Sequence, residues 1–115
     1  MASSVDALNR AYNATAGTVT HLSLHTGDPG TTGANEVTGG TYARVARGYS
    51  APTAGAGNIT SSATFNVPSG TTVSHWGAWD GSTFLFGRDL DVPQTFATDG
   101  TYTLVSAAFS VVDAF

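Results

Sequence analysis

The sequence predicts an all-β protein: an antiparallel β-sandwich or barrel-like fold with one short N-terminal helix. Short β-branched and aromatic runs carry an apolar residue at every second position, and Gly, Pro and Asp turn signals separate them. The alternation of strand and helix patterns that a parallel sheet requires is missing. A chain of 115 residues can bury one core. We therefore predict a single β domain over 1–115, with an N-terminal segment 1–17 ahead of a sandwich at 18–115.

The N-terminal segment carries a short amphipathic helix over residues 5–12. Val5, Leu8 and Tyr12 recur at spacings of three and four, a preceding serine can cap the first turn, and Gly17 ends the pattern. A helix of this length does not persist alone in water. We expect its apolar stripe to dock, either on its own sandwich or on a neighbouring molecule.

Six strands are predicted after the helix. On the first strand, alternation puts Leu22 and Leu24 on one face, opposite Val19, His21, Ser23 and His25. Asp-Gly pairs at 80–81 and 99–100 predict tight turns before the fifth and sixth strands. Residues 50–58, rich in Ala and Gly, are predicted to form a mobile surface loop. The predicted strands are 18–26, 42–49, 59–67, 72–79, 83–90 and 101–112.

Composition excludes several classes of function. The chain has no cysteine, so neither a disulfide framework nor a thiolate metal site can form. It has a net charge of −4, four arginines and no lysine, which speaks against a nucleic-acid partner. No apolar run reaches membrane-spanning length and no secretory signal is visible, so we expect no membrane partner. With 10% charged residues, the surface must consist mostly of neutral polar groups.

Metal binding by His21, His25 and Asp28 is disfavoured by geometry. On an extended strand the two histidines lie about 13 Å apart, whereas two imidazoles that share one ion lie within about 4 Å. We predict no metal site here, and expect one histidine to be partly buried and the other to lie at the strand end. Replacing His25 should then cost less stability than placing valine at Gly30 or Gly40. Calcium in one of the Asp-containing turns stays an open alternative.

No enzyme site is predicted. His75 and Asp80 could be combined with a serine into a triad, but no Gly-x-Ser-x-Gly nucleophile turn occurs. We therefore assign no catalytic residue and no cofactor. A carbohydrate-binding or hydrolytic module could use Trp76, Trp79 and Tyr42 as a stacking platform. Residues three apart on a strand face opposite sides, however, so at least one tryptophan should belong to the core.

The longest polar excursion is the loop inside residues 24–45, LHTGDPGTTGANEVTGGTYARV. Its glycines lack the lysine and the strand-to-helix step of a phosphate-binding loop. Proline followed by glycine predicts a turn with positive φ at the glycine, and the Gly pair at 39–40 predicts a second turn. We expect Asn35 and Glu36 to hold the loop, with Arg44 as the partner of Glu36. The candidate structural and interface residues are Asp28, Pro29, Gly30, Gly33, Asn35, Glu36, Gly39, Gly40, Tyr42 and Arg44.

The same stretch resembles a motif of small tailed-bacteriophage virion proteins. The segments LHT, DPG, GANEV, GG and YAR carry this resemblance, which is sharp over about twenty residues and loose elsewhere. Members are variously described as tail fibre, minor tail or head decoration proteins. The resemblance implies a structural role in assembly and carries over no catalytic residue.

From this resemblance we expect a capsid decoration protein on the exterior of the virion, made in the host cytoplasm. It would bind and stabilise the lattice of the major capsid protein, and would itself form a homotrimer. The alternative is a minor tail or tail-fibre protein of the same particle, and a carbohydrate-binding or hydrolytic module is a remote third. Decoration requires hundreds of copies per particle, whereas a tail component requires tens or fewer.

Overall fold

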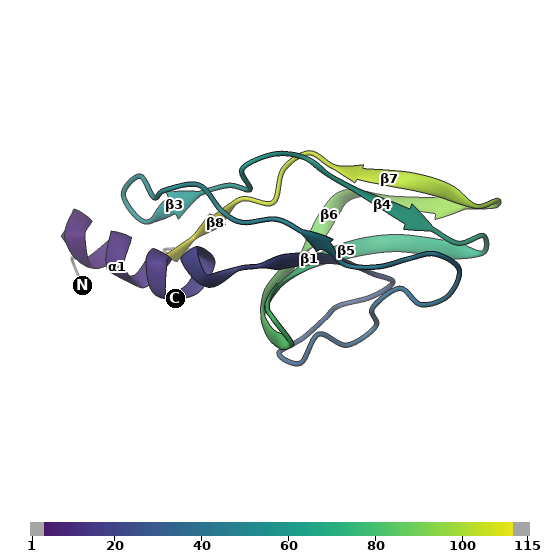
Figure 1. The fold of residues 1–115 in the computed structure, drawn as a ribbon, viewed down its shortest axis with the longest axis horizontal. Coiled ribbons are helices and arrows are strands. Elements are labelled where there is room, and N and C mark those ends of the chain that lie inside the picture. The colour runs from purple at the N-terminus through teal and green to yellow at the C-terminus, as the bar shows by residue number, and fades with distance from the viewer. Residues whose placement is uncertain (1–3, 112–115) are drawn as a thin grey trace.

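Figure 1 shows the computed structural model of the chain, which describes residues 4–111. One helix at the N-terminus precedes eight strands, and every strand pair is antiparallel, so the all-β prediction is confirmed. The sheets do not close on themselves, which makes the fold a sandwich. The elements are α1 (Val5–Thr15), the 3-10 turn η1 (Ala16–Thr18), β1 (His21–His25), β2 (Val45–Ala46), β3 (Ala56–Gly57), β4 (Ala63–Val67), β5 (Thr71–Asp80), β6 (Thr83–Phe96), β7 (Gly100–Leu104) and β8 (Phe109–Ser110).

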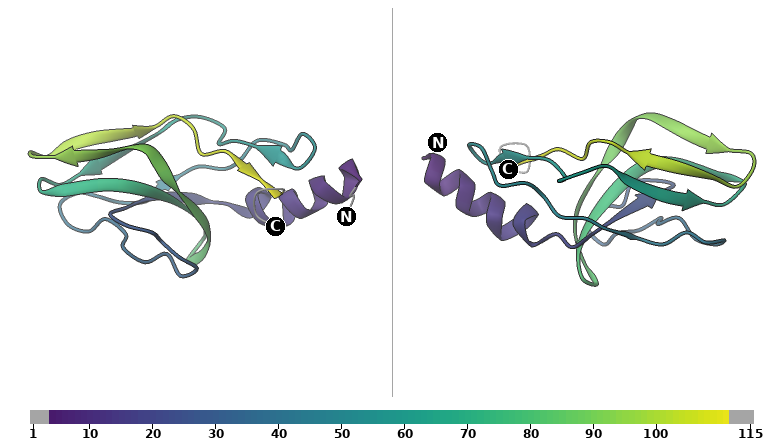
Figure 2. Two further views of the ribbon diagram at one scale, coloured as in Figure 1. Left: turned by 180° about the vertical axis from the view of Figure 1, so that it is seen from behind. Right: turned by 45° about the horizontal axis from the view of Figure 1, so that its top comes forward.

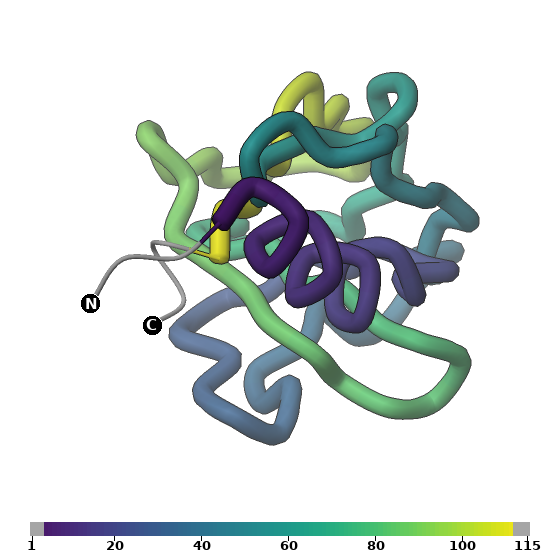
Figure 3. The backbone as a smooth tube through the Cα atoms, turned by 90° about the vertical axis from the view of Figure 1, so that its left-hand side faces the viewer, coloured from purple at the N-terminus to yellow at the C-terminus, as the bar shows by residue number. Residues whose placement is uncertain are grey.

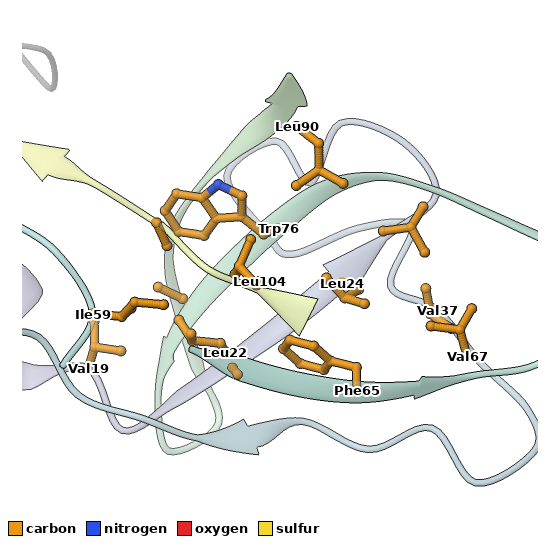
Figure 4. Packing of buried hydrophobic residues seen from close by; sticks show 14 residues of the cluster. Val19, Leu22, Leu24, Val37, Ile59, Phe65, Val67, Trp76, Leu90 and Leu104 are labelled. Atoms are coloured by element: carbon orange, nitrogen blue, oxygen red, sulfur yellow. The ribbon is translucent and has the colours of Figure 1, made fainter. Parts of the chain in front are cut away.

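Two sheets face each other across the main core. A four-stranded sheet has the order β2-β1-β5-β6, and the β4-β7 pair covers one of its faces (Figures 1 and 2). On β4 the burial alternates residue by residue, as the sequence predicted. Figure 4 shows how the side chains interlock in this core, which includes Leu22, Leu24, Trp76 and Leu90 from the large sheet and Phe65, Val67 and Leu104 from the pair.

The N-terminal helix docks at one end of the molecule, next to the β3-β8 pair (Figure 3). Tyr12 is fully buried, with its ring centroid 5.9 Å from that of Phe109. Its hydroxyl donates to the carbonyl of Ser50, and Asn9 Oδ1 accepts the N–H of Gly55 at 2.9 Å. The predicted docking is thus made on the chain's own fold, and the molecule extends over 48 × 24 × 23 Å.

Several predicted boundaries are wrong, for reasons visible in the contacts. The helix continues to Thr15, whose hydroxyl donates to Ala11 O, and residues 50–58 contain β3, which packs against α1. The segment 42–49 is strand only at Val45–Ala46, since its earlier side chains bind the preceding loop.

Three more of the predicted strands have different bounds in the structure. β4 is shorter than predicted and begins at Ala63, β6 runs on to Phe96, and residues 105–108 interrupt the last strand to give β7 and β8. The predicted end of that strand at Val112, like residues 1–3, lies outside the described part of the chain. Within residues 4–111 no helix is long and apolar enough to cross a membrane.

Strand β1 is covered on both faces. Leu22 and Leu24 point into the main core, and Ser23 and His25 lie on the opposite face, also with no exposed surface. Val19 was predicted on the histidine face but joins the core, because the strand begins only at His21 and the alternation does not extend back to it. The cover on the second face is the loop between β1 and β2, seen below the sheet in Figure 1.

Candidate functional site

The loop at residues 26–44 begins with the predicted turn. Asp28 Oδ1 accepts the N–H of Gly30 at 2.8 Å, and Gly30 has a φ of +60°. The carbonyl of Pro29 then accepts the N–H groups of Gly33 and Ala34 at 3.0 and 2.9 Å. Pro29 is itself buried, because its ring lies against the backbone of β6. The carboxylate of Asp28 therefore helps to form the turn.

Asn35 closes this first part of the loop. Its side-chain amide donates to the carbonyl of Asp28 at 3.0 Å, and its own carbonyl accepts the N–H of Thr26 at 2.8 Å. Two residues on, the N–H of Val37 donates to Leu24 O at 3.0 Å, so the chain runs along the edge of β1. Asn35 has a φ of +62°, a conformation in which asparagine is enriched. Asn35 thus joins the two ends of this part of the loop through its side chain and its backbone.

Glycines let the loop approach the sheet and turn back. A Cβ atom at Gly33 would lie 2.5 Å from the Cη2 atom of Trp79, so the loop reaches the indole only because the side chain is absent. Gly33 also has a φ of +79°. At the second predicted turn Gly39 and Gly40 have φ values of +101° and +57°. The N–H of Tyr42 donates to Gly39 O there, which closes the turn.

Glu36 and Arg44 form the ion pair that the sequence predicted. Arg44 Nη2 donates to Glu36 Oε1 at 2.9 Å, and Nε donates to Oε2 at 3.0 Å. Tyr42 OH donates to Glu36 Oε2 at 2.9 Å and accepts the N–H of Leu24 at 3.0 Å. Burial alone would raise the pKa of Glu36, but the hydrogen bonds from Arg44 and Tyr42 outweigh it and lower the pKa. The pair thus fixes the returning arm of the loop to β1.

Arg44 also contacts the sheet through Trp79. Its guanidinium carbon lies 3.5 Å from the centre of the indole, which is cation–π geometry. Phe84 packs edge-on against the same indole, with ring centroids 5.1 Å apart. Trp79 is therefore the point at which Gly33, from one arm of the loop, and Arg44, from the other, meet on the sheet.

A buried polar chain connects Trp79 to β1 and the loop. His25 Nδ1 donates to the carbonyl of Ala34 at 2.7 Å, since a carbonyl can only accept, so the neutral ring has an unprotonated Nε2. Ser23 donates its hydroxyl to that nitrogen at 2.7 Å and accepts the N–H of Trp79 Nε1 at 2.8 Å. Every polar side-chain atom of Ser23, His25 and Trp79 has a hydrogen-bond partner while His25 stays neutral. Burial correspondingly lowers the pKa of His25, as the largest of several influences.

The contact between Ser23 and His25 has the spacing of a nucleophile and its base, but both residues are fully buried and substrate cannot reach them. The stacking platform suggested for carbohydrate is likewise not exposed, because Trp76 and Trp79 are only 4% and 6% accessible and lie on opposite faces of β5. His25 lies at the strand end, as expected, and is fully buried with both ring nitrogens bonded. His21, at the start of the strand, is half-buried.

The loop at residues 26–44 is thus held against one face of the sheet by hydrogen bonds and packing, and all ten predicted loop residues belong to it. Comparison with curated proteins finds no similar sequence. A family model described as "Podophage GP4 fiber I protein gp80" matches residues 2–111. Because this match spans nearly the whole chain, the protein belongs to the podophage GP4 fiber I protein gp80 family of bacteriophage virion proteins.

Proposed function

We propose that this protein is a fibre-type structural component of the virion, attached at the tail, and that it acts by binding other virion subunits without catalysing a reaction. The observation that carries the proposal is the match of residues 2–111 to a family described as a fibre protein. That description favours the tail-fibre alternative over capsid decoration.

The geometry supports a scaffold role. The polar side chains on the second face of the sheet form hydrogen bonds within the molecule. These bonds connect His25, Ser23 and Trp79, and they pair Glu36 with Arg44. A loop fixed in this way presents its outer backbone and its exposed threonines in one fixed shape. Rigid loops bind protein partners with little loss of conformational entropy. We propose that the outer side of the loop at residues 26–44 contacts a neighbouring subunit.

We further propose that the chain assembles as a homotrimer within the virion. Closed cyclic symmetry completes the interfaces of each copy without leaving open ends. The major capsid protein remains the partner in the decoration alternative, and no nucleic acid or membrane is involved in either.

Copy number tests the proposal. The protein band in purified virions is quantified against a standard of the purified chain and against the major capsid protein. A tail fibre predicts tens of copies or fewer per particle. Hundreds of copies per particle would overturn the tail assignment and would favour a capsid decoration protein instead.

A further inference from the structure

A cleft of about 370 Å³ separates the free edges of β6 and β7. β6 is the last strand of the four-stranded sheet, and β7 pairs only with β4, so each strand has one edge without a partner among the described residues. Backbone N–H and C=O groups on such an edge can bind a further strand. The cleft is large enough for side chains as well as water, which occupies about 30 Å³ per molecule.

The cleft has an apolar floor and an apolar rim. Trp76, Leu90 and Leu104 line it, and all three side chains belong to the buried core. Val92 on β6 and Val105 after β7 lie on its two walls and are 74% and 76% exposed, the largest exposures among the big apolar side chains described. An added strand would cover both valines.

The β6 wall is acidic. Asp89 and Asp91 line the cleft and are exposed, and neither carboxylate has an ion pair or hydrogen bond within residues 4–111. Across the cleft, burial and the charge of Asp91 raise the pKa of Tyr102. Arg88 also lines the cleft, so the lining carries one more negative than positive charge. A basic side chain in the occupant would complement this wall.

From this cleft we infer that β7 accepts an extended segment of a different virion protein, one that alternates apolar side chains with a lysine or arginine. The segment would add to the sheet at the β7 edge. The β6 edge is unsuited to this, because β6 contains Pro93 and its pairing with β5 shifts register between Val73 and His75. β7 contains neither a proline nor a charged residue. Only the virion origin of the partner rests on the function proposed above.

A second copy of the chain is a poor occupant. It contains no lysine, and its arginines at 44 and 47 are hydrogen-bonded within their own fold. Arg88 lines the cleft itself, and Arg10 lies on the helix α1, where the backbone cannot pair with a strand edge. No extended segment of the described chain therefore offers a free cation to the cleft.

Photo-crosslinking in assembled particles tests the inference. Benzoylphenylalanine replaces Val105, and in a second variant it replaces Ser82, an exposed residue in the β5-β6 turn that serves as the control. Thermal unfolding first confirms that each variant folds. We expect Val105 to form a product with another virion protein, at a peptide containing lysine or arginine, and the Ser82 variant to lack that product. A folded Val105 variant that is excluded from particles would also support occupation of the cleft.

A product with a second copy, or no product from an incorporated Val105 variant, would overturn the inference. A separate pair of variants tests whether the occupant carries a basic side chain. Asp89→Asn/Asp91→Asn should lower the yield from Val105 several-fold, whereas Asp6→Asn/Asp80→Asn, with the same change of net charge, should not. Equal yields would refute the basic occupant. A product with the major capsid protein on the shell would support the cleft and contradict the tail location, so the two proposals fail separately.

Discussion

The guanidinium of Arg44 lies over the indole of Trp79, 3.5 Å from its centre, while two of its nitrogens hold the carboxylate of Glu36. One side chain thus connects the returning arm of a long loop to the middle of a sheet. Arginine suits this position because its planar group can stack on a ring and bind a carboxylate by two parallel bonds at once. The loop owes its fixed shape to this contact and to the buried chain beside it.

Arg44→Lys should lower the free energy of unfolding by about 1 kcal/mol, because an ammonium group neither stacks as a plane nor binds the carboxylate in two places. The arginine side chain is 32% exposed, so solvent screening keeps the loss modest. Urea unfolding measures it, with Arg10→Lys on the exposed face of α1 as the control. Equal stability of the two variants would show that the contact with Trp79 contributes nothing.

Gly33→Ala should destabilise the protein by about 2 to 4 kcal/mol, and Gly30→Ala by about 1 kcal/mol. Both glycines have positive φ, but only at Gly33 would the added methyl collide with Trp79, whereas nothing lies within 4 Å of it at Gly30. Thermal unfolding of both variants separates the close approach from the backbone conformation. The close approach would be refuted if Gly30→Ala were the less stable of the two.

Ser23→Ala should cost about 2 to 4 kcal/mol, because it leaves the Nε1–H of Trp79 and the Nε2 of His25 buried without partners. Ser82→Ala, at an exposed turn position, is the control and should be neutral. Denaturant unfolding gives both values. A neutral Ser23→Ala would mean that the buried chain is not bonded as described.

Stability should fall as the pH drops below about 6.5. The pKa of His25 is lowered in the folded state, so the unfolded chain takes up the proton first as the pH falls. The stability contributed by neutral His25 is therefore complete above the pKa of the unfolded state and is lost below it. Urea unfolding between pH 7.5 and 5 measures the slope, which cannot exceed about 1.4 kcal/mol per pH unit for one proton. His25→Gln should remove most of this slope and His21→Gln should retain it. An unchanged slope in His25→Gln would assign the effect elsewhere.

Local signals in the sequence were enough to predict the turns and one ion pair. Proline and glycine at 29–30 and the Gly pair at 39–40 strongly favour turns. Arg44 is the one cation in that loop, and Glu36 is nearer to it in sequence than Asp28, the other acid. Alternation placed Trp76 and Trp79 on opposite faces and paired Leu22 with Leu24 in the core. These features depend on neighbours in sequence, which is why they could be predicted.

The buried chain depends on a distant contact and was missed. Alternation places Ser23 and His25 on the face opposite Leu22 and Leu24, but only the folding of residues 28–34 across that face encloses them. One signal was available: two hydrogen-bonding side chains, Ser23 and His25, share that face of the strand. The length of α1 and the break at residues 105–108 were missed because tertiary packing sets those boundaries.

The location of the protein in the particle tests the central claim most directly. Cryo-EM reconstructions of virions with and without the protein, made without imposed icosahedral symmetry, give a difference map of its density. A fibre-type component predicts difference density only at the tail vertex, of a size that fits a few copies of a 48 Å molecule. Density repeated over the whole shell, with none at the tail, would contradict the account.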